Sequence, residues 1–137
     1  MATQADVRRI ALSLPGAEEG GAHSQFAFSV RRKGKAKGFV WVWMERVDPK
    51  KPRVPQPKVL AARVPTLAAK EALIVRDPTK FFTEPHYEGF PAVLVRLPEI
   101  SVTELRAVIA TAWKCLASPD HLLLAKQPRL KKRARLT

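Results

Sequence analysis

Clustered positive charge is the feature of this sequence that most limits how the chain can fold. Residues 31–63 and 126–135 hold 17 of the 25 lysine and arginine residues but only two of the 12 acidic residues. The two stretches carry a formal charge of +15, whereas the whole chain carries +13. Close like charges repel one another into solvent, so both stretches are expected to lie in water. The sequence therefore predicts a nearly neutral folded body with two cationic projections.

The length and composition of the chain predict one folded domain. A chain of 137 residues normally forms a single domain, and 46% apolar residues are enough for a core. We place the domain at residues 1–125 and treat residues 126–137 as a basic, flexible tail. No run nears the roughly 18 consecutive apolar residues that a membrane helix needs, and the polar start has no signal-peptide pattern. These features predict a cytoplasmic protein.

Three segments begin with residues that favour a helix N-terminus. Thr3 precedes an amphipathic pattern that ends at residues 14–16, and Thr66 precedes a second helix. Ser101 and Glu104 have the spacing of a capping box, which predicts a third helix after them.

Four segments alternate in polarity or are rich in β-branched residues, as strands are. We expect residues 26–30 to form a half-buried strand, residues 58–64 another strand and residues 92–97 a central one. Residues 39–44 are expected to form a strand that runs back beside residues 26–30, with side chains that alternate between two faces. That alternation places Phe39, Trp41 and Trp43 on one face and Val40, Val42 and Met44 on the other.

Two connections between these strands are expected to be basic loops. Residues 31–38 contain five cations and two glycines, which favours a turn that protrudes into solvent as a wing. Residues 48–57 contain four prolines and three cations. Because proline cannot donate a backbone hydrogen bond, this second segment is not expected to form a regular strand.

Several short motifs occur in an order that resembles one known family. Over about residues 3–122 the chain resembles the MmcQ/YjbR family, and the segment at residues 85–91 is the most specific part. The motifs are Leu14-Pro-Gly-Ala-Glu-Glu19, a Phe-x-Val strand start, Asp77-Pro-x-x-Phe-Phe82, Pro85-His-Tyr-x-Gly-Phe-Pro91, Val93-Leu-Val-Arg-Leu97 and Trp113.

The resemblance implies a small α+β fold of the CyaY-like type, in which helices pack against an antiparallel β-sheet. This fold is described for the family as a double-wing DNA-binding fold, and its members generally lack an assigned reaction. Because a shared fold does not define an activity, the resemblance supports nucleic-acid binding without proving it. The proline-rich loop at residues 48–57 and the basic tail depart from the family pattern.

The clustered cations favour a polyanionic partner. Counterion release attracts such clusters strongly to phosphate backbones, so we expect nucleic acid, and DNA in preference to RNA. An acidic lipid surface is the second candidate partner for these cations. We nevertheless expect neither a membrane partner nor an obligate protein partner. The alternative is a solvated surface or solubility tail without a partner. The residues that we expect to contact nucleic acid are Arg31, Arg32, Lys33, Lys35, Lys37, Lys50, Lys51, Arg53, Lys126, Arg129, Lys131, Lys132, Arg133 and Arg135.

Trp41 and Trp43 allow two interpretations. Beside the cations of residues 31–38 they could stack on bases, as aromatic residues do in proteins that bind single strands. Alternating aromatic residues on a strand that also carries Val40 and Val42 are more often part of a core. We favour the core.

A second candidate site is the turn after Pro85, which presents His86 and Tyr87. Binding and catalytic groups are often found on such loops, whereas the alternative is that these residues only fix the shape of the turn. The adjacent carboxylates of Glu18 and Glu19 are candidates for the same pocket, and their alternative is a solvated loop. Sequence spacing cannot show whether these two loops meet.

The sequence has no pattern for a metal, a cofactor or a catalytic triad. His23, His86 and His121 lack the spacing of metal ligands, and the single Cys115 forms neither an internal disulfide nor a metal site by itself. We therefore assign no catalytic residue and no cofactor, and we expect a binding protein rather than an enzyme. Two alternatives stay open: an enzyme or small-ligand-binding protein with a pocket near His86 and Tyr87, or a protein-interaction adaptor.

Overall fold

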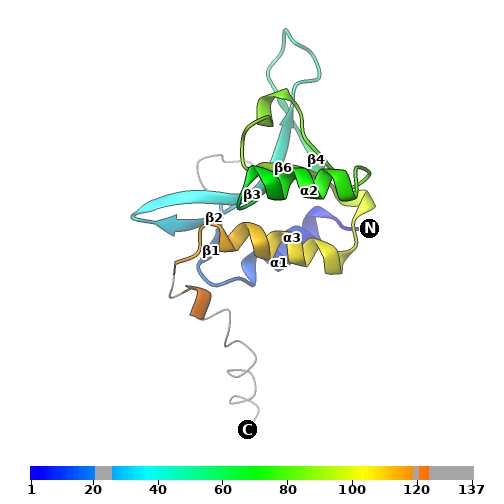
Figure 1. The fold of residues 1–137 in the computed structure, drawn as a ribbon. Helices are drawn as coiled ribbons and strands as arrows, with labels where there is room; N and C mark the ends of the chain where they lie inside the picture. Colours follow the sequence, from blue (N-terminus) through cyan, green and yellow to red (C-terminus); the bar gives the residue numbers. More distant parts are fainter. Residues whose placement is uncertain (21–25, 119–120, 124–137) are drawn as a thin grey trace.

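The chain folds as an α+β structure built on one six-stranded antiparallel sheet, as expected (Figure 1). The computed structural model describes residues 1–20, 26–118 and 121–123. The strands lie in the order β1-β2-β3-β4-β6-β5 across the sheet. They are β1 Ala17–Glu19, β2 Ala27–Arg32, β3 Lys35–Glu45, β4 Val54–Arg63, β5 Phe81–Phe82 and β6 Ala92–Arg96. The helices are α1 Gln4–Leu12, α2 Leu67–Arg76 and α3 Val102–Lys114, with 3-10 turns η1 Pro85–Tyr87 and η2 Leu97–Glu99.

Side-chain caps start the three α-helices where the sequence predicts them. Thr3 and Asp6 form a reciprocal capping box at α1, and the Thr66 hydroxyl accepts the Ala69 N–H at α2. The Ser101 hydroxyl accepts the Glu104 N–H at α3. The Glu104 carboxylate does not complete the expected box, because it accepts a hydrogen bond from Lys80 Nζ at 2.7 Å instead.

The main core lies between the sheet and helices α1 and α3. Val93, Ala62, Val40 and Phe28 face one another across four strands, and all four are buried in this core. The predicted strand at residues 92–97 is confirmed as β6, but it is not central. Residues 81–82 form a short strand outside it, so β6 is second from the edge.

A register shift beside Phe39 changes the predicted two-faced pattern of residues 39–44. The pairing register shifts between Phe28 and Ser29 of β2, so that Phe39 and Val40 are both buried in the main core. Trp41 pairs with Ala61, next to the core residue Ala62, and therefore lies on the opposite face of the sheet. A β-bulge inserts one residue and reverses the side on which later side chains lie, which a simple alternation cannot foresee.

The second connection is shorter than predicted, because residues 54–57 belong to β4. Pro55 pairs with Met44 of β3, although it has no N–H to donate. The pairing of β4 with β6 begins only at Val59, so the preceding residues have a neighbour on one side only. Prolines are tolerated where one side of a strand is free, and this explains why two of them fit here.

Candidate nucleic-acid interface and central pocket

The first basic projection, which we call the first wing (residues 31–37), is the end of the β2–β3 hairpin. Lys33 and Gly34 form a two-residue turn with φ of 54° and 80°. Paired φ values of this sign are typical of a tight hairpin turn whose twist matches that of the strands. The predicted turn over residues 31–38 is therefore mostly strand. The hairpin extends away from the body of the fold (Figure 1).

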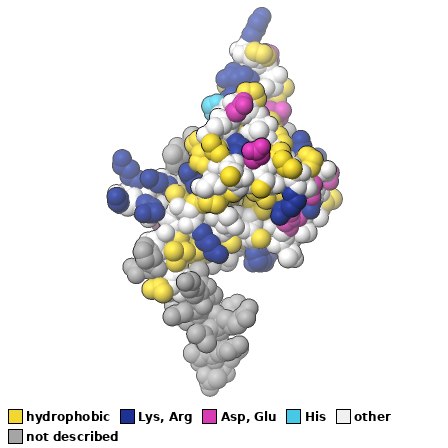
Figure 2. All heavy atoms as spheres, in the orientation of Figure 1, with side chains coloured by type: hydrophobic (Ala, Val, Ile, Leu, Met, Phe, Trp, Pro, Cys, Tyr) yellow, Lys and Arg dark blue, Asp and Glu magenta, His cyan; other side chains and the backbone are white. Residues whose placement is uncertain are grey.

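Four cations of the first wing line one hollow. Arg32, Lys33, Lys35 and Lys37 surround a cavity of about 330 Å³. Arg32 and Lys35 are direct cross-strand partners. Like charges in that position repel each other and destabilise a hairpin. Figure 2 shows lysine and arginine side chains gathered at the end of this hairpin.

Arg31 and Arg32 are attached to the body of the protein, whereas the lysines of the wing are not. The Arg31 guanidinium lies 3.4 Å from a Glu18 carboxylate oxygen, and Arg32 Nη1 donates to the Leu116 carbonyl at 3.2 Å. Among the described residues, no ion pair or hydrogen bond uses the side-chain nitrogens of the three lysines at positions 33, 35 and 37. These ammonium groups are available to an external anion.

The second basic projection, which we call the second wing (residues 46–53), joins β3 to β4. Arg46 Nη1 donates to the carbonyls of Pro49 and Lys51, at 3.4 and 3.0 Å, and so holds the loop closed. Lys50 and Lys51 are exposed at its tip. The sequence-based set of contact residues did not include Arg46, although it lies within the basic stretch and directly follows a strand.

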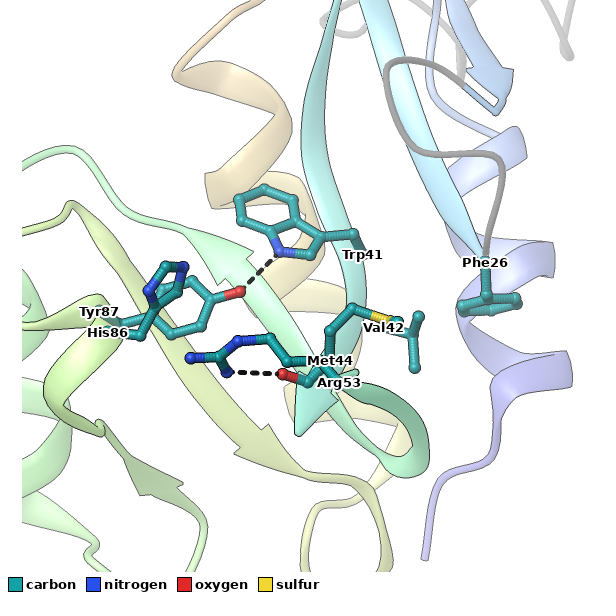
Figure 3. A pocket seen from close by; sticks show the side chains of 7 residues that line it. All are labelled: Phe26, Trp41, Val42, Met44, Arg53, His86 and Tyr87. Carbon is teal, nitrogen blue, oxygen red and sulfur yellow. Dashed lines mark hydrogen bonds between the residues drawn. The ribbon is translucent and has the colours of Figure 1, made fainter. Parts of the chain in front are cut away.

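A central pocket of about 300 Å³ lies along β3 between the two wings (Figure 3). The pairing of β2 with β3 ends at Ala27 and Trp41, and one further hydrogen bond joins the Val42 N–H to the Phe26 carbonyl at 2.8 Å. Beyond Val42, no described strand pairs with this edge of β3. The pocket forms where β3 continues beyond its neighbour. Its lining residues are Phe26, Trp41, Val42, Met44, Arg53, His86 and Tyr87.

Polar contacts fix the orientation of three pocket residues. The Trp41 indole N–H donates to the Tyr87 hydroxyl at 3.0 Å, and Arg53 Nη1 donates to the Met44 carbonyl at 3.0 Å. Burial raises the pKa of the Tyr87 phenol, so this group stays protonated near neutral pH. Since its oxygen accepts from Trp41, the Tyr87 hydroxyl still has its own proton to donate.

Lys70 of α2 holds the turn that carries His86 and Tyr87. Its side chain is buried, and its ammonium donates to the carbonyls of Tyr87 and Phe90. Burial lowers the pKa of Lys70, and the nearby Glu88 carboxylate opposes this shift. Sequence reasoning missed Lys70, because a single lysine in an amphipathic helix gives no sign that it points inward.

Replacing Lys70 with methionine should lower the free energy of unfolding by roughly 2 kcal/mol, because two carbonyls lose their charged donor. Methionine keeps most of the apolar stem. Urea denaturation measures the change, and faster hydrogen exchange of the Phe90 amide, which bonds to the Tyr87 carbonyl, would locate it in the turn. Arg76→Met on the same helix is the matched control, since it removes only an exposed ion pair. Equal stability of the two variants would contradict the assigned role.

The structure places the predicted pocket residues in two different regions. His86 and Tyr87 line the central pocket, whereas Glu18 and Glu19 do not. The two carboxylates lie on β1, where they pair with Arg31 and with Arg8. Within the part of the chain that the structure describes, no hydrogen bond or ion pair joins His86 to a carboxylate.

Trp41 and Trp43 lie outside the main core, contrary to our interpretation. Both are half-buried on the face of the sheet opposite α1 and α3. Trp43 contacts Phe82 edge to face, with ring centroids 5.7 Å apart. Of the two tryptophans, Trp41 lines the central pocket, so its ring has a surface available for stacking on a base.

The remaining predicted contacts fall outside the described residues. The six tail cations, the domain boundary after residue 125 and His23 all lie in undescribed segments. In the described ranges, no group of three or more His, Cys, Asp or Glu side chains is placed to hold a metal ion. No helix in those ranges has the length and apolar character needed to cross a membrane.

A solved structure shares this fold. The crystal structure of Deinococcus radiodurans protein DR2400, a DUF419 domain, superposes with a TM-score of 0.61 over 93% of this chain and 82% of that chain, at 19% sequence identity. DUF419 is the MmcQ/YjbR family. At this identity the likeness shows the fold alone, which is therefore a DUF419-like α+β fold. No family model matches the chain.

Mycobacterial proteins are similar to part of the sequence. The uncharacterized proteins Rv2570 of Mycobacterium tuberculosis and Mb2600 of Mycobacterium bovis are each 42% identical to it over 71 residues. The match covers 52% of this chain and 54% of each relative. The chain thus spans about half the length of these relatives, and their names assign no activity.

Proposed function

We propose that this protein belongs to the MmcQ/YjbR family and binds nucleic acid through phosphate contacts from its two basic wings. The cation-lined hollow of the first wing carries the proposal. Arg32 and Lys35 face each other across the hairpin, and Lys33 and Lys37 complete the hollow. A phosphate group placed among these cations would relieve their repulsion and release condensed counterions.

The position of the second wing supports contact with one long polyanion. Lys37 of the first wing lies near the start of β3 and Arg46 of the second wing directly follows its end, nine residues further along the chain. At about 3.3 Å per residue, the separation is at most about 30 Å. A duplex rises by about 3.4 Å per base pair, so roughly 9 base pairs reach from the inner end of one wing to the inner end of the other.

A salt series with the full-length chain tests this function. If the wings and the tail cations together meet about six to eight phosphates, the slope of log K against log salt for duplex DNA should be near −5 to −7, taking about −0.9 per contact. Fluorescence anisotropy with labelled duplex DNA, single-stranded DNA and RNA measures the slope for each. Negligible binding of all three near physiological salt would rule the function out.

A further inference from the structure

The central pocket adjoins the second wing. Trp41, Val42 and Met44 come from the stretch of β3 between the first and second wings. Arg53 belongs to the second wing itself and lines the pocket as well. A polyanion held by the cations of the second wing therefore lies beside this pocket.

The lining of the pocket is suited to a flat ring system. Phe26, Trp41, Tyr87 and His86 contribute four aromatic rings. Every base has a π face that stacks on such rings, with little dependence on its sequence. A volume of about 300 Å³ is at the lower end of the range for small-molecule sites, so there is room for one ring system and little more.

Two polar groups can recognise the edge of such a ring or the phosphate beside it. The Tyr87 hydroxyl is held by the Trp41 indole and keeps a proton to donate. Arg53 uses one N–H on the Met44 carbonyl, and no other described residue accepts a hydrogen bond from its guanidinium group. Figure 3 shows the side chains of Trp41, Arg53, His86 and Tyr87 close together, with Phe26 across from them.

We propose that the central pocket receives one unpaired base of the nucleic acid that the wings hold. This inference rests on the proposed function, because the second wing brings the strand to the pocket. A base inside a duplex is stacked on both sides, so the pocket favours single-stranded regions or bases that have been extruded. The wings supply contacts to the backbone, and the pocket adds a contact to one base.

Oligonucleotides with and without bases separate the pocket from the wings. The full-length protein is titrated with a 12-residue oligothymidylate and with an oligonucleotide of equal length and charge in which all residues are abasic. We expect the abasic strand to bind about tenfold more weakly, as the loss of one stacked base predicts, with the same salt slope. Equal affinities would overturn the base pocket and leave the wing function intact. If neither strand nor duplex DNA binds, both proposals fail.

Matched variants assign the difference to the pocket. Phe26→Ala should remove most of the preference for the strand with bases, while Lys51→Gln should leave it unchanged. Arg53→Gln and Lys51→Gln each remove one cation from the second wing, but only Arg53 lines the pocket. If Arg53→Gln weakens the binding of the oligothymidylate more than Lys51→Gln does, the result supports the pocket as the site for the base.

Nuclear magnetic resonance gives a direct readout that does not depend on affinity. The Trp41 indole N–H signal, assigned with Trp41→Phe, should shift with the oligothymidylate and not with the abasic strand, whereas the indole signal of the buried Trp113 should not move with either. Equal shifts of the Trp41 signal with both strands would overturn the proposal even if the affinities differ.

Discussion

Replacing Lys33, Lys35 and Lys37 together with glutamine is expected to weaken the binding of duplex DNA on the order of 100-fold at 0.1 M salt. Each lost phosphate contact removes about 0.9 from the salt slope, so three contacts should make it shallower by about 2.7. The three side chains are exposed on the first wing. Their removal should relieve repulsion within the hairpin and leave stability unchanged or slightly raised. Fluorescence anisotropy across a salt series measures both affinity and slope.

The matched control neutralises three cations outside both basic stretches. Arg9, Arg106 and Lys114 are exposed on α1 and α3. The control protein has the same net charge as the wing variant, so total charge cannot explain a difference between them. An equal loss of affinity in the two proteins would mean that the charge acts diffusely, and the wing would then not be the binding surface.

Replacing Trp113 with alanine is expected to cost about 3–5 kcal/mol of unfolding free energy, the range for large aromatic residues in cores. Trp113 is fully buried, and its indole N–H donates to the Pro15 carbonyl at 2.9 Å. That hydrogen bond connects the end of α3 to the turn after α1. Since small domains are stable by only roughly 5–15 kcal/mol, this single change should bring the protein close to unfolding.

Urea denaturation and thermal melting measure this loss. Trp113→Phe separates its two parts, because phenylalanine keeps most of the packing and removes the donor to Pro15. We expect it to cost about 1–3 kcal/mol, the penalty for leaving a buried carbonyl without its partner. A loss below 1 kcal/mol for Trp113→Ala would contradict the central place of this residue in the core.

The helices could be predicted because their signals are local, whereas the fold class was implied by the resemblance to a known family. Thr3, Thr66 and Ser101 each accept a backbone N–H within three residues, so the side chain that starts the helix is its sequence neighbour. In α3 the buried residues Leu105 and Ile109 are four positions apart, which is the same kind of local spacing. Such patterns depend on a few consecutive residues, which is why they hold without knowledge of the rest of the chain.

The details of the sheet could not be predicted, because they depend on which strands become neighbours. Residues 54–57 form a strand despite two prolines, since β6 does not reach them and one side of β4 is free. The register shift in β3 placed Phe39 in the core beside Val40, while Trp41 lies on the opposite face. Both outcomes follow from pairing between distant segments.

The candidate site, too, could be predicted only in part. The two basic wings were visible in the sequence, because a run of cations must lie in water wherever the chain folds. The central pocket was only partly visible: His86 and Tyr87 were candidates, but their partners Trp41, Arg53 and Phe26 come from three other segments. Glu18 and Glu19, which looked like suitable companions, are used at the far edge of the sheet to pair with arginines.

By itself, the sequence determined where charge must be exposed, where helices begin and which residues could form a core, since solvation and local hydrogen bonding act over a few residues. Only the tertiary structure decided that Lys70 points inward to hold the turn of His86 and Tyr87, and that β3 continues beyond β2 to open a pocket between the wings. These features depend on contacts between residues that are distant in the sequence, such as Lys70 and Tyr87, which are 17 residues apart. Such contacts form only when the whole sheet is assembled, and local sequence patterns do not indicate them.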